Sequence, residues 1–267
     1  MLKDITLGQF FPGNTLVHRI DPRFKLLMIF AFMISLFMMK GAVSLTIMSV
    51  FVFVSVIASK IGIKMIFKNL KPLMFLILFT VCLNMFFTPG ETLWQLGFVR
   101  ITREGVEFSV LMAVRIILLI VGTSLLTYTT SPIRLTDAIE QLLSPLKRLK
   151  IPVGELAMMM TIALRFIPTL LNETDRIMSS QKARGADFES GGVIKRIKAF
   201  VPVLVPVFVS AFKRADELAL AMESRCYRDG TGRTRLNQLK SNRFDWVILA
   251  VSVVFFSSAA VLGVLGY

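Results

Sequence analysis

Residues 106–128 have the sequence VEFSVLMAVRIILLIVGTSLLTY, an apolar run with two charged residues, Glu107 near one end and Arg115 near the middle. A helix needs about 20 mainly apolar residues to cross the hydrocarbon core of a bilayer. This run is long enough, so it predicts a transmembrane helix. A charge at the depth of Arg115 is costly in lipid, which makes this residue a candidate for a functional or structural role.

Four other runs along the chain have the same character. The predicted spans are residues 24–39, 41–59, 72–88, 106–128 and 245–266. The chain is 55% hydrophobic with a mean hydropathy of +0.70, whereas ordinary soluble domains are about 45 to 50% apolar. We therefore expect an all-α polytopic membrane protein with about five transmembrane helices. Because only Lys40 separates the first two spans, they should form a tight helical hairpin.

Positive charge is unequally shared between the two sides of these spans. Four lysines lie between residues 60 and 71, whereas the loops on the other side carry Lys40, Arg100 and Arg103. By the positive-inside rule the 60–71 loop and the N-terminus are cytoplasmic. Residues 129–243 are then cytoplasmic too, and their 19 Lys or Arg and 11 Asp or Glu give a net charge of +8.

Anionic lipid headgroups or an acidic partner protein account for this charge better than nucleic acid, because no nucleic-acid-binding motif accompanies it. We therefore expect a cell-membrane protein that binds no nucleic acid. The expected organisation is a cytoplasmic N-terminal segment, four transmembrane helices, a cytoplasmic domain and a final transmembrane helix. These parts correspond to residues 1–23, 24–128, 129–243 and 244–267.

Three helices are predicted in the cytoplasmic domain. Residues 134–149 have the spacing of an amphipathic helix, which Pro145 should kink near its end. A second helical pattern covers about 153–184, which corresponds to a rod of roughly 45 Å with a bend expected at Pro168. A third covers about 193–226. The last two need partners for their apolar faces, so we expect these long helices to cross.

The third helix contains the uncharged run Ala199–Phe212. As a helix this run is only about 21 Å long, which is shorter than the hydrocarbon core. We expect it to pack in a core or to enter the bilayer partly, rather than to cross. Arg184 and Arg225 would then lie on the same side of the membrane.

The two long helices end in related sequences. Asp175 lies nine residues before Arg184, and Asp216 lies nine residues before Arg225. The residues at these ends are Ala183, Arg184, Gly185 and Ser224, Arg225, Cys226. Arginine can bind a carboxylate with two parallel hydrogen bonds, so the pair can serve as matched contacts for acidic grooves. The alternative is two ordinary cations that favour a helix C-terminus. Gly185 fits a left-handed helix cap.

Several segments together resemble one family. Residues 18–25, HRIDPRFK, are similar to its Leu-Asp-Pro-Arg-x-Lys segment, and residues 142–152 followed by 163–168 are similar to its coupling region. Ala183-Arg184-Gly185 matches the first of its two Ala-Arg-Gly motifs, and Ser224-Arg225-Cys226 keeps only the arginine of the second. The chain resembles the transmembrane T component of energy-coupling-factor transporters, relatives of ABC transporters that take up vitamins and metal ions.

The resemblance implies that Arg184 and Arg225, with the residues beside them, contact two cytoplasmic ATPase subunits. It also implies that the membrane helices and the coupling helices hold a separate substrate-binding S component. ATP hydrolysis by the partners would move the coupling helices and topple the S component. The cytoplasmic region 129–243 would then be a three-helix coupling domain, and the chain a non-catalytic subunit.

Rival chemistry finds little support in the sequence. No Gly is followed by Lys, so a phosphate-binding loop is missing and ATP must be bound by partner subunits. His18 is the only histidine, which excludes two-histidine zinc motifs. We expect no cofactor, metal or catalytic group in this chain.

A self-contained secondary transporter or channel is the alternative function. Arg115 and Asn84 would then line the solute path, whereas the structural interpretation has Arg115 held by backbone carbonyls or by Asn84. A carrier of this kind often contains an inverted membrane repeat. The only repeat found is the cytoplasmic one, which favours the coupling role.

Overall fold

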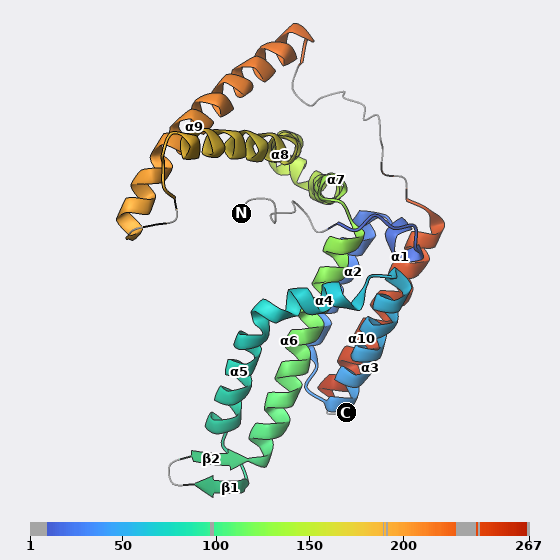
Figure 1. The fold of residues 1–267 in the computed structure, drawn as a ribbon. Helices are drawn as coiled ribbons and strands as arrows, with labels where there is room; N and C mark the ends of the chain where they lie inside the picture. Colours follow the sequence, from blue (N-terminus) through green and yellow to red (C-terminus); the bar gives the residue numbers. More distant parts are fainter. Residues whose placement is uncertain are drawn as a thin grey trace. The chain divides into compact units, whose positions relative to one another are not determined.

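The computed structural model describes residues 10–96, 99–188, 190, 192–227, 239 and 241–265. These residues are almost entirely helical, with one two-stranded antiparallel hairpin (Figure 1). They divide into two compact units. Of the described residues, those within 10–138 and 239–265 form the core unit, and those within 139–227 form the crossing unit. The two are described separately.

The core unit contains the helices that flank and include the predicted spans. Its first elements are α1 (Leu16–Arg19), α2 (Pro22–Met38), α3 (Ala42–Ser59), α4 (Ile63–Leu70), the 3-10 turn η2 (Lys71–Leu73) and α5 (Met74–Phe87). The hairpin strands β1 (Thr92–Leu96) and β2 (Val99–Thr102), then α6 (Arg103–Thr129) and α10 (Arg243–Val264), complete it. The helix α7 (Pro132–Leu143) begins in this unit and ends in the crossing unit.

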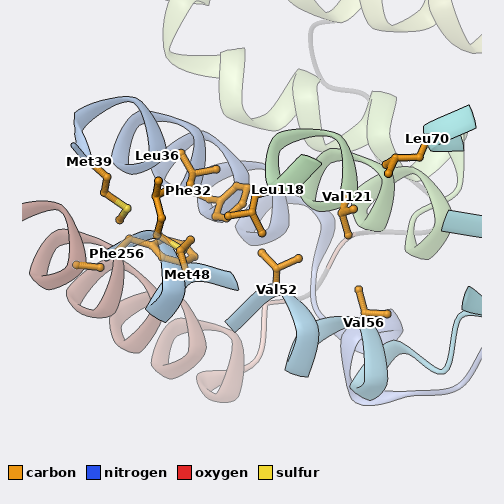
Figure 2. Close-up of a cluster of buried hydrophobic side chains, with 12 residues drawn as sticks. Phe32, Leu36, Met39, Met48, Val52, Val56, Leu70, Leu118, Val121 and Phe256 are labelled. Carbon is orange, nitrogen blue, oxygen red and sulfur yellow. The ribbon is translucent and has the colours of Figure 1, made fainter. Parts of the chain in front are cut away.

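Aliphatic and aromatic side chains at helical spacing form the centre of the core unit (Figure 2). Leu45, Met48, Val52 and Val56 of α3 belong to one buried cluster with residues of α2, α6 and α10. Gly122 of α6 leaves room for the Phe32 ring of α2, because a Cβ at this position would lie 2.5 Å from that ring. Small residues allow such close helix packing inside membranes.

The predicted hairpin of residues 24–39 and 41–59 is wrong in its packing. The short connection exists, but among the described residues α2 and α3 pack against α10 and α6 rather than along each other. The reason lies at the far end of the chain. Gly263 of α10 brings its backbone against Met39 and Ser44, and Phe256 of α10 meets the rings of Phe32 and Phe51. A local sequence pattern does not reveal this competitor.

Five helical stretches of the described chain are long and apolar enough to cross a membrane. They are Ala42–Ser59, Ile63–Phe87, Arg103–Thr129, Val153–Ala183 and Arg243–Val264. Four of them overlap predicted spans, and the remaining predicted span, residues 24–39, overlaps α2, which has 17 residues. The prediction of an all-α polytopic membrane protein is confirmed. The stretch without a counterpart among the predicted spans is Val153–Ala183, which is α8. Its cytoplasmic placement remains a prediction.

Two local features were not predicted. The 60–71 loop contains a helix, α4, and residues 92–102 form the hairpin of β1 and β2, which pairs Thr92 with Thr102 and Leu96 with Val99. The hairpin joins α5 to α6, which pack along each other.

The crossing unit contains the end of α7, the 3-10 helix η3 (Ser144–Leu149), α8 (Val153–Ala183) and α9 (Val193–Ser224). The helix predicted over residues 134–149 changes type at Pro145, since α7 stops at Leu143 and the 3-10 helix η3 begins beside that proline. Figure 1 shows α8 and α9 crossing, as predicted. Within the described chain α9 is not among the helices able to span a membrane, which agrees with the expectation for Ala199–Phe212.

Candidate partner-binding helix ends

The end of α8 is a Schellman cap with Arg184 at the C-cap position. The amide of Gly185 donates to the carbonyl of Lys182 at 3.0 Å, and the amide of Ala186 donates to the carbonyl of Gln181 at 3.0 Å. These two hydrogen bonds satisfy carbonyls that the helix leaves free. Gly185 has φ +89°, in the left-handed region that the cap requires. The predicted left-handed cap at Gly185 is confirmed.

The end of α9 repeats this arrangement with Arg225 at the C-cap position. The amide of Cys226 donates to the carbonyl of Glu223 at 2.9 Å, and the amide of Tyr227 donates to the carbonyl of Met222 at 3.0 Å. Cys226 has φ +55°, so a non-glycine residue occupies the left-handed position. The repeat in sequence is therefore also a repeat in backbone structure.

All six residues predicted to contact a partner are exposed. They are Ala183, Arg184, Gly185, Ser224, Arg225 and Cys226. In the part of the chain that the structure describes, neither arginine forms an ion pair. Nine residues correspond to two and a half helical turns, which places Asp175 and Asp216 on the faces opposite their arginines. The guanidinium groups are thus free to bind a carboxylate from another molecule.

Polar contacts hold the crossing of α8 and α9. Arg214 Nη2 of α9 lies 3.2 Å from Glu173 Oε2 of α8, and Ser210 Oγ donates to Glu173 Oε1 at 2.5 Å. Further along, the hydroxyl of Tyr227 donates to Met158 Sδ at 2.9 Å. Lower numbers on α8 thus face higher numbers on α9, so the contacting parts run antiparallel.

This antiparallel pairing separates the two arginines. Arg225 ends α9 beside Tyr227 and therefore lies near Met158, in the first part of α8. Arg184 lies 26 residues further along α8, which corresponds to about 40 Å of helix. The two exposed ends are consequently at opposite ends of the pair, too far apart to serve one small ligand.

In the core unit, the segment HRIDPRFK (residues 18–25) forms a polar junction. Asp21 caps α2 by accepting a hydrogen bond from the amide of Arg23 at 2.9 Å. The Arg23 guanidinium binds both carboxylate oxygens of Asp21 at 2.7 to 3.1 Å and donates to the carbonyl of Leu239 at 3.2 Å. The amide of Asp21 also lies 3.4 Å from Asp245 Oδ1 in the first turn of α10.

The buried ammonium of Lys25 belongs to the same junction. Its Nζ donates to the carbonyl of Thr129 at 3.1 Å, to Thr129 Oγ1 at 3.3 Å and to Thr130 Oγ1 at 3.2 Å. These threonines end α6. Through Lys25 and Arg23, one short segment holds both the end of α6, at Thr129 and Thr130, and the backbone at Leu239, where the chain re-enters the core unit. The sequence showed the motif but not these partners.

His18 is buried at the edge of this junction. Its Nδ1 lies 2.6 Å from Thr15 Oγ1 and its Nε2 lies 3.1 Å from the carbonyl of Phe11. Burial lowers the pKa of His18, and the hydrogen bond to Phe11 opposes this shift. No group of three or more potential metal ligands occurs among the described residues.

Arg115 is held by backbone. Its Nη2 donates to the carbonyl of Met39 at the end of α2, and its Nη1 lies 3.6 Å from Met112 Sδ. Asn84 instead donates to the carbonyl of Thr80 in its own helix. Of the two structural partners predicted for Arg115, the structure shows a backbone carbonyl and not Asn84.

Comparisons with known proteins agree on one family. Residues 13–238 match the family CbiQ, described as cobalt transport protein. Proteins named energy-coupling factor transporter transmembrane protein EcfT are 52% identical in Ruminiclostridium cellulolyticum, over 96% of each chain, and 47% identical in Bacillus subtilis, over 95% of this chain and 96% of the relative. The relative from Acidaminococcus fermentans is 49% identical over 98% of both chains. These matches cover nearly the whole chain, which therefore belongs to the family of energy-coupling factor transporter transmembrane proteins, multi-pass membrane components of a multi-subunit transporter.

Proposed function

We propose that this chain is the coupling subunit of an energy-coupling-factor importer for a vitamin or a metal ion. It binds two cytoplasmic ATPase subunits through Arg184 and Arg225 and holds a separate substrate-binding S component. The observation that carries the proposal is the pair of matched, exposed arginine C-caps at opposite ends of the α8 and α9 pair.

Two equal contacts about 40 Å apart suit two copies of a similar partner. A helix end is a rigid platform, because the Schellman hydrogen bonds fix the backbone on both sides of the arginine. A guanidinium placed this way can bind a carboxylate in a groove with two parallel hydrogen bonds. Movement of either partner is then passed to the helix that carries the arginine.

The proposed orientation places the N-terminus and the crossing unit in the cytoplasm. The lysines at residues 60–71 and the net charge of +8 in residues 129–243 support this side by the positive-inside rule. ATP binds to the partner subunits and not to this chain, which has no phosphate-binding loop.

The S component binds to apolar surface on the membrane helices and on the coupling helices. α9 supports this assignment because large apolar side chains along it are exposed, among them Phe208 at 61% and Phe212 at 67%. Exposed apolar patches of this kind mark protein or membrane contacts. A self-contained carrier gains no such support, since Arg115 and Asn84 bond to separate backbone carbonyls.

The test is a double charge reversal, Arg184→Glu with Arg225→Glu. We expect ATPase subunits to be lost on copurification and ATP-driven uptake to be abolished, with the protein still inserted in the membrane. The matched control is Arg103→Glu with Arg243→Glu, which reverses two exposed arginines outside α7, α8 and α9 and should keep both properties. Normal assembly and uptake in the Arg184 and Arg225 variant would refute the proposal.

A further inference from the structure

The helix α4 has one side that packs against α6. The hydroxyl of Tyr128 donates to the carbonyl of Met65 at 3.1 Å, and Asn69 Nδ2 donates to Ser124 Oγ at 3.2 Å. Leu70 is buried in the main apolar cluster. Tyr128 and Ser124 belong to the last turns of the membrane-spanning helix α6. The contacts therefore place α4 at the level where α6 reaches the membrane surface.

The remaining surface of α4 is exposed and has two chemically different stripes. Lys64 and Lys68 lie one turn apart and are both exposed, and Lys71 extends their stripe into η2. Ile63 and Phe67, also one turn apart, are each 62% exposed. Residues spaced by four lie on the same face of a helix, so a cationic stripe runs beside an apolar one.

The charge of this stripe has no counter-charge nearby in the sequence, because no Asp or Glu occurs between Asp21 and Glu91. None of the three lysines is in an ion pair in the described part of the chain. Among the described residues, no acidic side chain compensates the cationic face.

The direction of α4 fits a place in the membrane interface. Figure 1 shows α4 lying across α6 in the core unit, whereas α5, which follows it, runs along α6. A helix in the interface plane buries its apolar side chains at the level of the acyl chains and extends its lysines toward the headgroups. In α4 the lysine stripe and the apolar stripe lie side by side, and the third side of the helix packs against α6.

We propose that the lysine face of α4, formed by Lys64, Lys68 and Lys71, binds the anionic headgroups of phospholipids in the cytoplasmic leaflet. The side of the membrane follows the orientation given under Proposed function. An acidic protein partner would also complement the charge, but it would leave Ile63 and Phe67 without an apolar environment. Lipid satisfies both stripes at once, through phosphate groups and acyl chains.

The test uses the full purified chain in detergent and compares its binding of phosphatidylglycerol and phosphatidylcholine with identical acyl chains, by native mass spectrometry. The test variant replaces the lysines of the stripe with glutamine, K64Q/K68Q/K71Q. A second variant, K64R/K68R/K71R, keeps the charge. The matched control removes three exposed lysines from α9, K195Q/K198Q/K213Q.

We expect the wild-type chain, the arginine variant and the α9 control to prefer phosphatidylglycerol by roughly tenfold or more, from several surface lysines acting together. This preference should fall to about onefold in the glutamine variant, and it should weaken in the wild-type chain at high salt. The arginine variant shows whether charge at these positions is sufficient.

Two results would overturn the proposal. One is an equal loss of preference in the α9 control, which would mean that only net charge matters. The other is an unchanged preference in the glutamine variant together with loss of a copurifying protein, which would assign the stripe to an acidic partner. Because this assay needs no ATPase subunit, its outcome is independent of the test of Arg184 and Arg225.

Discussion

At the end of α8 the left-handed position is occupied by Gly185, with φ +89°, and at the end of α9 it is occupied by Cys226, with φ +55°. The hydrogen bonds around the two positions are the same, and the preceding residue is an exposed arginine in both. The left-handed conformation costs a residue with a Cβ about 1 kcal/mol or more, and glycine almost nothing. The shared feature is therefore an arginine at a Schellman C-cap, and the glycine only lowers the cost of the cap.

The largest expected effect comes from reversing one arginine at a time. Arg184→Glu and Arg225→Glu should each weaken the corresponding ATPase contact by about 2 to 5 kcal/mol, roughly 30-fold to several thousand-fold in affinity, because an acidic groove then faces a carboxylate. If the two ends are equivalent, the two variants lose uptake to the same degree. Uptake assays of both, at equal membrane levels of protein, measure this equivalence.

A smaller loss of uptake should follow when the contact between α8 and α9 is weakened while Arg184 and Arg225 stay in place. Glu173→Lys places a cation beside Arg214 and removes the acceptor for Ser210, so the crossing of α8 and α9 should loosen. Both arginine contacts then weaken together, with a severalfold loss of uptake and partial retention of ATPase subunits. Glu217→Lys changes an exposed residue of α9 and serves as control. Wild-type uptake in the Glu173 variant would show that the crossing does not need this contact.

Substitutions at the two left-handed positions should change the stability of the helix ends in opposite directions. Gly185→Ala should destabilise the end of α8 by about 1 kcal/mol, and Cys226→Gly should stabilise the end of α9 by up to about 1 kcal/mol. A Cβ on Gly185 meets no atom within 4 Å, so only the backbone conformation acts. Amide hydrogen exchange in the last turn of each helix measures both effects.

Gly154→Ala is the control for that comparison. Gly154 lies in the first turn of α8 outside the left-handed region, and a Cβ there would meet no atom closer than 3.8 Å, so amide exchange in the last turns of α8 and α9 should not change. If Gly185→Ala and Cys226→Gly changed amide protection in the same direction, the shared cap geometry would be contradicted.

The smallest expected effect is a pH dependence of stability that arises at His18 in the core unit and not at the helix ends. The pKa of His18 is lowered in the folded chain by burial, so the unfolded chain binds a proton first as the pH falls. The stability that neutral His18 provides is present above its unfolded pKa of about 6.5 and is lost as the pH falls through the lower folded value. Thermal unfolding at pH 7.5 and 5.5 should show this decrease in the wild-type chain and less of it in His18→Gln. Arginine stays charged over this range, so ATPase retention should not change for this reason.

The sequence predicted the helices and the arginine ends well because their signals are local. Apolar spacing identified the long helices, and Gly185 identified one cap. Cys226 carried no such signal, since cysteine has no preference for positive φ, and the repeated spacing to Asp216 indicated only a second helix that ends at an arginine. The same limit explains the error for α2 and α3, where α10, more than 200 residues away from α2, decides the packing.

Two features needed the structure. The antiparallel register of α8 and α9, which separates Arg184 from Arg225, depends on Glu173, Ser210 and Arg214, and no pattern in the sequence pairs them. The helix α4 lies in the 60–71 segment, which the charge pattern predicts only as a cytoplasmic loop. The i, i+4 spacing of Lys64 and Lys68 beside Ile63 and Phe67 is the signal that could have revealed it.

The number of ATPase subunits retained per chain tests the central claim most directly. Quantitative mass spectrometry of the affinity-purified full-length chain with its partners provides this ratio. Two subunits are expected for the wild-type chain, one for Arg184→Glu, one for Arg225→Glu and none for the double variant. Retention of two subunits by the double variant would contradict the assignment of these arginines as the ATPase contacts.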